Sequence, residues 1–369
     1  MTSDLESFHE LLMRKGIAFV RFRLPGQPNA KTYISYLPES FSDLNYLFSN
    51  KKKGFVFAPF QTNKETPIWF LTANEIIDDS SDLQQQEEFL LQLPDRIQYI
   101  QHPEIPSTSK IKYSDSFSKL MQDLETEQID KVILSKIVSK QRNKETLFEL
   151  FARLSKTYPQ AFTYFIHLNT GELWMGASPE LLLEQKENEI RTMALAGTQT
   201  LANRELANLV WNSKEQKEQA YVADYVSAIL QSRVGKNGFE QTETYSVQAG
   251  NLAHLRTDFR IQKDVDRTLA FDLIKKLHPT PAVCGIPLEA AKSRIEKTET
   301  HRRKYYTGFL GPIHSDSLRF FVNLRCMQIL PEYYALYVGG GITRDSELEK
   351  EWLETEAKAQ TLLSVIQSN

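Results

Sequence analysis

Apolar positions in the first third of the chain follow a helical period once and form strand-like runs thereafter. Four apolar residues repeat on one face of a helix that ends before Gly16, namely Leu5, Phe8, Leu11 and Leu12. Apolar runs at 17–24 and 55–60, bounded by Pro, Gly, Asn and Ser, predict strands. The polar stretch from about 80 to 118 predicts a loop-rich or partly helical connection.

From residue 131 onward, strand and helix patterns mix, and consecutive strand patterns are joined by short turns. Strands are expected at 132–138, 161–168, 173–177, 181–183, 190–195 and 333–338, with two long strands within 305–330. Helices are expected after a cap at Asn143, over 202–232, 265–277 and 287–298, and after a cap at Ser346. This order favours large antiparallel sheets covered by helices over a βαβ repeat, so the expected fold class is α+β.

Composition and charge narrow the class of protein. The 369 residues are 41% hydrophobic, which is enough to bury a large core. A formal net charge of -3 gives no basic field for a nucleic-acid backbone, so we expect a small-molecule ligand and no nucleic-acid partner. Acidic residues interrupt the first ten positions, which favours neither a signal peptide nor a membrane span. We expect a cytoplasmic protein that does not bind a membrane, and by default a monomer.

The two cysteines, Cys284 and Cys326, lie far apart and form no CxxC or Cys/His spacing. This usage suits a reducing compartment and argues against a zinc site. Small buried core residues are the simpler interpretation of both.

Two expected helices carry the same pair of carboxylates. Glu215 and Glu218 are three residues apart on one helix, and Glu351 and Glu354 repeat that spacing on the last helix. Residues three apart share a helix face, so each pair points in one direction. If the two faces meet, the oxygen-rich environment suits Mg2+ and an anionic ligand. On the pattern alone, two solvated helix faces explain the same residues.

Gly339, Gly340 and Gly341 follow an expected strand and precede a capped helix. Bare backbone N–H groups there can approach an anion closely, although on the pattern alone a tight turn is the better interpretation of the glycines. Arg325 falls in an otherwise apolar expected strand over 320–326. A guanidinium in such a strand needs a partner, and a carboxylate is its best geometric match, whether from a ligand or from the protein.

Three further positions are candidates for acid–base chemistry. Lys131 opens an apolar strand, where burial can lower the pKa of a lysine enough for it to act as a base. Glu180 follows Ser178 and Pro179 at a break between strands, where a carboxyl can project into a cleft. His254 is either a core histidine or a donor in a site, and the residues around it do not decide. No GxSxG, phosphate-loop or Rossmann motif occurs.

Several short sequence blocks follow one another in order between Lys131 and the C-terminal helix. They are KVILSK at Lys131, MGASPELL at Met175, ALAGT at Ala194, KEQKEQ at Lys214, HPTPAVCGIP at His278, YTGFLG at Tyr306, the strand with Arg325, and GGGI at Gly339 followed by EWLETEAK at Glu351. Together they resemble the chorismate-utilising enzymes: isochorismate synthase, salicylate synthase, anthranilate synthase component I and aminodeoxychorismate synthase component I. The resemblance implies a single domain over 1–369, with a variable N-terminal portion (about 1–128) and a motif-bearing catalytic portion (about 129–369).

The resemblance also implies a Mg2+ cofactor and a binding site for chorismate. Glu218 and Glu354 would be the main magnesium ligands, with Glu215 and Glu351 helping directly or through water. The substrate carboxylates and ring would be held by a larger set: Arg325, Tyr306, Lys358, His254 and the backbone around Gly197, Thr198, Gly339 and Gly341. Two features depart from the family pattern, because Gln219 replaces a histidine and the stretch between Thr198 and Lys214 is short.

Within the family, the resemblance favours isochorismate synthase, an isomerase that makes isochorismate for menaquinone or for a siderophore. Lys131 lies where enzymes that use water carry lysine, and Ala196 lies where aminodeoxychorismate synthases carry lysine. Lys131 would be the general base for water attack at C2, and Glu180 the general acid at the C4 hydroxyl. Burial would lower the pKa of the lysine and raise that of the glutamate. Salicylate synthase and a non-catalytic chorismate-binding homologue are the alternatives.

Overall fold

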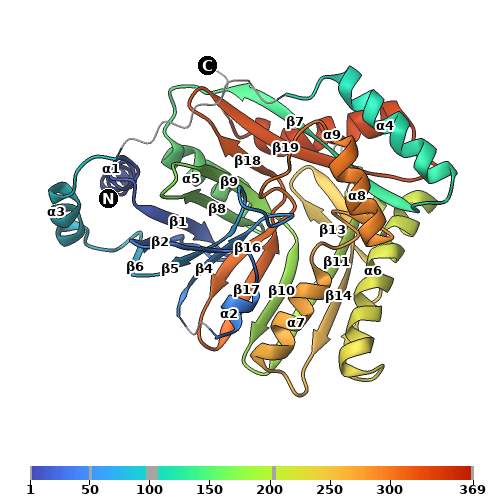
Figure 1. The fold of residues 1–369 in the computed structure, drawn as a ribbon, viewed down its shortest axis with the longest axis horizontal. Coiled ribbons are helices and arrows are strands. Elements are labelled where there is room, and N and C mark those ends of the chain that lie inside the picture. The colour runs from blue at the N-terminus through green and yellow to red at the C-terminus, as the bar shows by residue number, and fades with distance from the viewer. Residues whose placement is uncertain (1, 50–51, 97–106, 202–204, 367–369) are drawn as a thin grey trace.

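The computed structural model describes residues 2–49, 52–96, 107–201 and 205–366. The chain forms two large antiparallel sheets (Figure 1). The first has nine strands among the described residues, in the spatial order β15 (Gly285–Ile286), β7 (Lys131–Gln141), β19 (Tyr333–Ile342), β18 (Cys326–Ile329), β9 (Leu173–Ser178), β8 (Phe162–His167), β1 (Ala18–Arg23), β2 (Lys31–Ser35) and β6 (Glu75–Asp78).

The second sheet has ten strands, counted over the same described part of the chain. Nine of them follow the order β12 (Glu240–Gln241), β14 (Leu252–Ile261), β11 (Glu189–Thr200), β10 (Leu181–Lys186), β17 (Ser317–Val322), β16 (Phe309–Ile313), β4 (Gly54–Ala58), β5 (Ile68–Thr72) and β3 (Glu39–Phe41). Strand β13 (Tyr245–Ala249) pairs with β14 beside this path. The N-terminal strands stand together at one end of each sheet, β1, β2 and β6 in the first and β4, β5 and β3 in the second, so each sheet is built from both portions of the chain.

Aromatic side chains fill the space between the two sheets. The rings of Phe162 on β8 and Phe321 on β17 stack with centroids 4.3 Å apart, and Phe57 on β4 stacks on Tyr305 at 4.0 Å. Trp174 on β9 is fully buried in the same cluster. Because each strand alternates its side chains between two faces, the opposite faces remain apolar and need helices to cover them.

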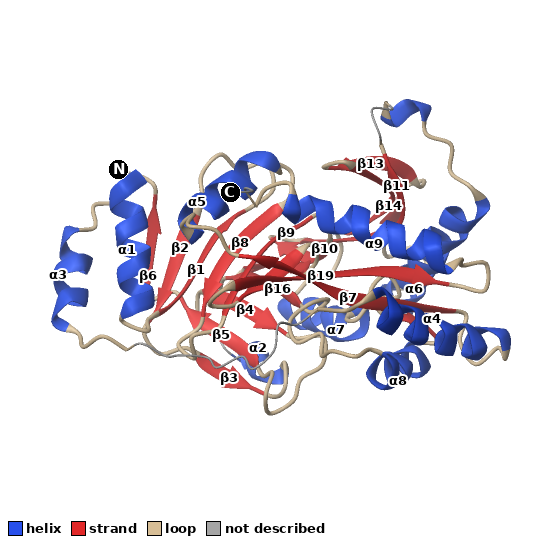
Figure 2. Ribbon diagram, turned by 90° about the horizontal axis from the view of Figure 1, so that it is seen from above, coloured by secondary structure: helices blue, strands red, loops and turns tan. Residues whose placement is uncertain are grey.

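Helices cover those outer faces. Their bounds are α1 Thr2–Arg14, α2 Asn45–Ser49, α3 Gln84–Gln92, α4 Lys110–Glu125, α5 Leu147–Thr157, α6 Ser213–Val234, α7 Arg267–Leu277, α8 Leu288–Thr298 and α9 Leu348–Leu363. Helices α1, α5 and α9 share a core cluster with the first sheet, and α6 and α7 share one with the second. Figure 2 shows α1 and α3 at one end of the molecule and α4, α6 and α8 at the other. This is the α+β arrangement that the sequence predicts.

The predicted starts of three helices were wrong. Helix α5 begins after Thr146, whose hydroxyl and the Glu149 carboxylate form a complete capping box, so Asn143 is not the cap. Helix α9 has Glu347 at its N-cap position, because the Ser346 hydroxyl accepts the Thr343 N–H in the preceding turn. Helix α6 begins at Ser213, not at 202, because the Asn212 side chain caps it there. Residues 202–204 of the predicted helix lie outside the described residues.

The region 305–342 also differs from its prediction. Residues 305–330 contain three strands, β16, β17 and β18, where two were predicted. Arg325 lies between β17 and β18 with a φ of 47°, in the left-handed region, and is not part of a strand. Gly339, Gly340 and Gly341 form neither a turn nor a loop, because β19 runs through them and pairs with β7 over 132–141.

Two of the points at which the chain crosses between the two sheets are adjacent. From β9 to β10 it passes through Glu180, and from β17 to β18 it passes through Arg325. Backbone hydrogen bonds join these crossings, because the Val322 N–H donates to Glu180 O at 3.0 Å and the Ala177 N–H donates to Arg325 O at 3.1 Å. Two residues that are 145 positions apart in sequence are thereby held at one place, between the sheets. Among the described residues, no helix is long and apolar enough to span a membrane.

Candidate active site

A cavity lies at these crossings, where the two sheets diverge. Ten of the residues proposed from the sequence line it: Glu180, Gly197, Thr198, Glu218, His254, Tyr306, Arg325, Gly339, Gly341 and Lys358. They come from both sheets and from α6 and α9. Lys131, Glu215, Glu351 and Glu354 lie behind this lining and contact it or its backbone.

Lys131 is fully buried at the start of β7. Its Nζ lies 3.0 Å from Oε1 of Glu218 on α6, which is the ion pair that joins this strand to that helix. A Cβ at position 341 would lie 2.7 Å from the same Glu218 oxygen and 3.1 Å from Lys131 Cε. Glycine is therefore required at Gly341 for the two charged groups to meet across β19.

Glu180 is 3% exposed, and burial raises the pKa of its carboxyl to about 8, against a smaller lowering by the Lys131 charge. The carboxyl is therefore protonated at neutral pH. The pKa of Glu218, the carboxylate that pairs with Lys131, is shifted in the opposite direction. Burial raises the pKa of Glu218, but Lys131 and Lys358 outweigh that effect and lower it, so Glu218 is ionised. The cavity thus holds one neutral carboxyl and one carboxylate.

Arg325 and His254 form a fixed cationic unit on the opposite wall. Nδ1 of His254 lies 3.0 Å from Gly197 O, and since a carbonyl only accepts, Nδ1 carries the proton. Nε2 of His254 therefore accepts from Arg325 Nη2 at 2.7 Å. Burial and the Arg325 charge lower the pKa of His254 to about 3, consistent with this neutral tautomer. A second guanidinium nitrogen of Arg325 donates to Ala249 O at 3.0 Å.

The remaining proposed substrate-binding groups surround this unit. Thr198 Oγ1 lies 3.3 Å from His254 Nδ1, and Gly197 has a φ of 68° with Glu215 packed against it. Tyr306 stacks on Tyr337 with ring centroids 5.5 Å apart. Its hydroxyl lies against Gly339, 3.0 Å from the position that a Cβ would occupy there. Lys358 donates to Gly339 O at 3.0 Å. These contacts place donors for an anion around one cavity.

The carboxylates proposed as metal ligands approach β19 from both of its faces. Strand β18 ends opposite Tyr337, so within the described residues no strand pairs with that edge of β19 over 338–342. Glu218 lies beside Gly341, and Glu351 and Glu354 lie beside Gly340. Lys214 pairs with Glu351, and Lys358 pairs with Glu354 at 2.8 Å.

The chemistry of this donor set fits a hard divalent cation. Oε2 of Glu351 is buried without a hydrogen bond of normal geometry from a described residue, and burial together with Glu354 raises the pKa of Glu351. A cation would contact that oxygen and offset the repulsion between Glu351 and Glu354. A closed ligand cluster is not assembled, since the described residues contain no group of three His, Cys, Asp or Glu side chains at metal-binding spacing. Glu215 uses one oxygen to accept its own helix's Asn212 N–H at 3.2 Å.

The two departures from the family pattern have local consequences. Gln219, which replaces a histidine, is buried and donates to Ala194 O and to Thr257 Oγ1, both at 3.2 Å. It therefore fastens α6 to the second sheet and does not line the cavity. The stretch after Thr198 contains only one short 3-10 turn, Leu206–Asn208, among its described residues.

The cavity has further lining residues that the reasoning from single residues missed. They are Ile133, Pro179, Leu195, Ala196, Ala282, Val283, Thr307, Leu324, Tyr337 and Val338. Most are apolar and lie within, or next to, the sequence blocks that carry the resemblance. Ile133 could have been identified because it lies two residues after Lys131, and residues i and i+2 of a strand point to the same face.

Comparisons with known proteins identify the family of the chain. The family model described as chorismate binding enzyme matches residues 16–367. The vibriobactin-specific isochorismate synthase of Vibrio cholerae is 28% identical over 268 residues, covering 70% of this chain and 68% of that protein. Isochorismate synthase EntC of Escherichia coli K12 is 29% identical, covering 65% of this chain and 63% of that protein.

Among solved structures, the isochorismate synthase DhbC of Bacillus anthracis superposes with a TM-score of 0.79. The alignment covers 100% of both chains at 20% identity, which is a likeness of fold. The family model, by contrast, covers the sequence itself almost from end to end. The chain therefore belongs to the chorismate binding enzyme family.

Proposed function

We propose that this protein is an isochorismate synthase, which converts chorismate to isochorismate by adding water at C2 and expelling the C4 hydroxyl. The observation that carries the proposal is that a buried lysine, Lys131, and a buried and protonated carboxyl, Glu180, lie at one cavity. Relatives named as isochorismate synthases support it. The relatives' names include both a siderophore and a menaquinone enzyme, and either use of isochorismate is compatible with the site.

In the proposed mechanism, Lys131 first loses the proton that it carries in its ion pair with Glu218, and its neutral amine then removes a proton from the attacking water. Glu180 donates its proton to the departing hydroxyl, and the ring double bonds shift between the two positions. A carboxyl with a pKa of about 8 is a suitable acid near neutral pH, because it is protonated and still gives up its proton readily. Arg325, held by His254, would bind a substrate carboxylate, since a guanidinium fork matches a carboxylate with two parallel hydrogen bonds.

We also propose that Mg2+ binds at the open edge of β19. Glu218 and Glu354 would be the main ligands, with Glu351 and Glu215 contributing directly or through water. The ion would neutralise and orient the substrate's ring carboxylate. Lys131, Lys214 and Lys358 hold the carboxylates in place through their ion pairs.

The compartment and assembly state are part of the same proposal. Cys284 and Cys326 are both buried free thiols, which suits a reducing cytoplasm. The cavity is formed within one chain, so a monomer is sufficient for the proposed reaction.

Replacing Lys131 by methionine should remove most turnover. The loss of a general base costs about 10²- to 10⁴-fold in kcat. Lys136→Met is the matched control, since Lys136 is also fully buried on β7 but contacts Glu356 and Trp352 on the other face. Steady-state assays with chorismate and circular dichroism would compare the two. More than about a tenth of wild-type kcat in Lys131→Met would contradict the proposed base.

The raised pKa of Glu180 predicts a pH-dependent gain in stability on replacement by glutamine. Below the ordinary pKa of 4.5 the folded and unfolded states are both protonated; as pH rises toward 8, the unfolded state ionises first and wild-type stability falls. Glu180→Gln removes this loss. Its advantage in free energy of unfolding should grow between pH 5 and 8, by up to about 4 kcal/mol, and then level off. Urea unfolding at each pH measures this. An advantage that does not vary with pH would exclude a raised pKa.

Removing a proposed metal ligand should lower the apparent affinity of the enzyme for Mg2+. We expect Glu354→Gln and Glu218→Gln to raise the Mg2+ concentration for half-maximal activity at least about tenfold, because a cation loses a direct oxygen ligand. Glu349→Gln is the control, since Glu349 lies on the same helix but is exposed and paired with Lys110. Full activity of the wild type in EDTA, or an unchanged Mg2+ requirement in both variants, would remove the metal from the proposal.

A further inference from the structure

The outer edge of β7 is covered by another strand only at its beginning. Strand β15 pairs with Lys131 and Val132, and the Ile133 N–H donates to Cys284 O at 2.9 Å. Beyond Ile133, within the described residues, no strand pairs with this edge. The backbone groups of a buried strand edge need partners, since an unpaired buried N–H or C=O is costly.

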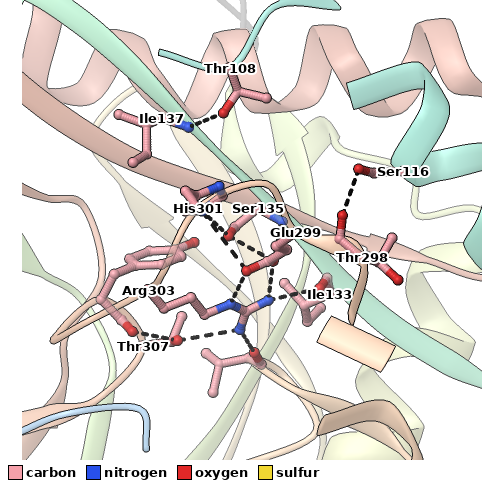
Figure 3. Close-up of polar contacts among 12 residues, drawn as sticks. Thr108, Ser116, Ile133, Ser135, Ile137, Thr298, Glu299, His301, Arg303 and Thr307 are labelled. Atoms are coloured by element: carbon pink, nitrogen blue, oxygen red, sulfur yellow. Dashed lines mark hydrogen bonds and ion pairs between the residues drawn. The ribbon is translucent and has the colours of Figure 1, made fainter. Parts of the chain in front are cut away.

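Side chains take the place of the missing strand (Figure 3). Arg303 donates from Nη2 to Ile133 O at 2.8 Å, and the Ser135 N–H donates to Glu299 Oε1, also at 2.8 Å. The Ser135 hydroxyl donates to the same carboxylate oxygen at 2.8 Å. Farther along the edge, the Ile137 N–H donates to Thr108 Oγ1 at 3.1 Å. A single ion pair thus binds the strand two and four residues after Lys131.

Glu299 and Arg303 are themselves almost completely buried, with side chains 2% and 3% exposed. Two hydrogen bonds join them: Arg303 Nε donates to Oε2 at 2.9 Å and Nη2 donates to Oε1 at 2.6 Å. The remaining guanidinium nitrogen donates to Val283 O at 2.7 Å. Burial raises the pKa of Glu299, but the charge and hydrogen bonds of Arg303, with smaller contributions from His301 and Ser135, together lower it below its ordinary value, so the pair is ionised.

The pair contacts three segments that line the cavity, at Ile133, at Val283 and at residues 306–307. Arg303 binds the backbone of Ile133 and Val283, its own carbonyl accepts the Tyr306 N–H at 2.9 Å, and its Nη1 lies 3.4 Å from Thr307 Oγ1. All four of these residues line the cavity. Neither Glu299 nor Arg303 lines the cavity, so we expect neither to touch the substrate.

A buried ion pair is a poor way to gain stability alone, because removing two charges from water costs about as much as their attraction returns. Apolar side chains of similar size would fill the same space, but they could not bind Ile133 O, Val283 O and the Ser135 N–H. The distinctive property of the pair is therefore the backbone geometry that it imposes.

We propose that Glu299 and Arg303 are positioning residues, which fix the backbone of β7 and so aim Lys131 at the reacting centre. The inference rests on the proposed function through Lys131. A displacement of about 1 Å in a catalytic group can cost on the order of 10²-fold in rate. The pair lies close enough along the strand to control such a displacement, since Ile133 and Lys131 belong to the same face of β7.

Two conservative variants test the proposal. In Arg303→Lys, one ammonium cannot donate to Ile133 O, Val283 O and both Glu299 oxygens at once. In Glu299→Gln, the carboxamide keeps an acceptor for Ser135 but removes the charge. We expect each to lower kcat for chorismate at least about tenfold while KM changes less than about threefold. Ser135→Ala, which keeps the ion pair intact and leaves no buried charge unpaired, should lower kcat at least about threefold.

Thr108→Val is the matched control, because it removes a side-chain hydrogen bond from the same strand edge but six residues away from Lys131. Its kcat should remain within about twofold of wild type, even if its melting temperature falls as far as that of Arg303→Lys. A purely structural role would lower the melting temperature of all variants and leave kcat per folded molecule unchanged. That result would overturn the proposal.

Hydrogen exchange measures the strand independently of turnover. In Arg303→Lys and Glu299→Gln, amides in peptides over 131–137 should exchange at least about tenfold faster than in wild type, with β1 unchanged as an internal reference. Unchanged exchange in 131–137 would overturn the positioning role, whatever the kinetics. A wild type that does not consume chorismate would refute the proposed function, while the exchange data would still decide whether the pair holds β7.

Discussion

The two neighbouring crossings between the sheets are the constraint on which the candidate site depends. Each sheet alone would present a continuous apolar face, and the space between two such faces would contain only apolar side chains. At the crossings, however, the backbone turns out of both sheets, and its groups pair with each other across the gap. Glu180 and Arg325 occupy the turning points, so their side chains enter the space between the sheets. The strain of a left-handed residue at Arg325 is tolerated because the two crossings hold one another.

The charges around this space are balanced in pairs. Three lysines, Lys131, Lys214 and Lys358, each pair with a glutamate from α6 or α9. Arg325 differs from these lysines, because its buried guanidinium donates to a neutral histidine and a carbonyl and not to a carboxylate. An anionic substrate would supply the countercharge, and a divalent cation would compensate the additional carboxylates. This balance explains why burial does not force every ionisable group to become neutral, as it does Glu180.

The sequence predicted the parts of the fold that depend on local pattern. Alternation and apolar runs identified most strands, and the order of the blocks identified the family. Prediction failed where distant contacts decide the local structure. Glycines normally weaken a strand, yet β19 continues through Gly339–Gly341 because β7 pairs with it throughout. Asn323 is the one turn-forming residue in 323–325, and the apolar residues on both sides of it outweighed that signal, so Arg325 was placed in a strand.

The candidate site shows the same division. Lys131 and Glu180 could be proposed because each stands at an end of a strand pattern and matches a family block. Glu299 and Arg303 could not, because an i, i+4 acid–base pair near the end of a helix is usually a solvated surface pair. Only the fold shows that the pair is buried against Ser135, 164 residues away in sequence.

The identity of the product tests the account most directly. Enzyme, Mg2+ and chorismate would be incubated near neutral pH in water labelled with oxygen-18, with mass spectrometry of the product and a lactate dehydrogenase assay for pyruvate. The account predicts an isomer of chorismate that carries the label on ring carbon C2, with no pyruvate released. Pyruvate appearing in step with the loss of chorismate, or a product that forms only when ammonium is added, would contradict it.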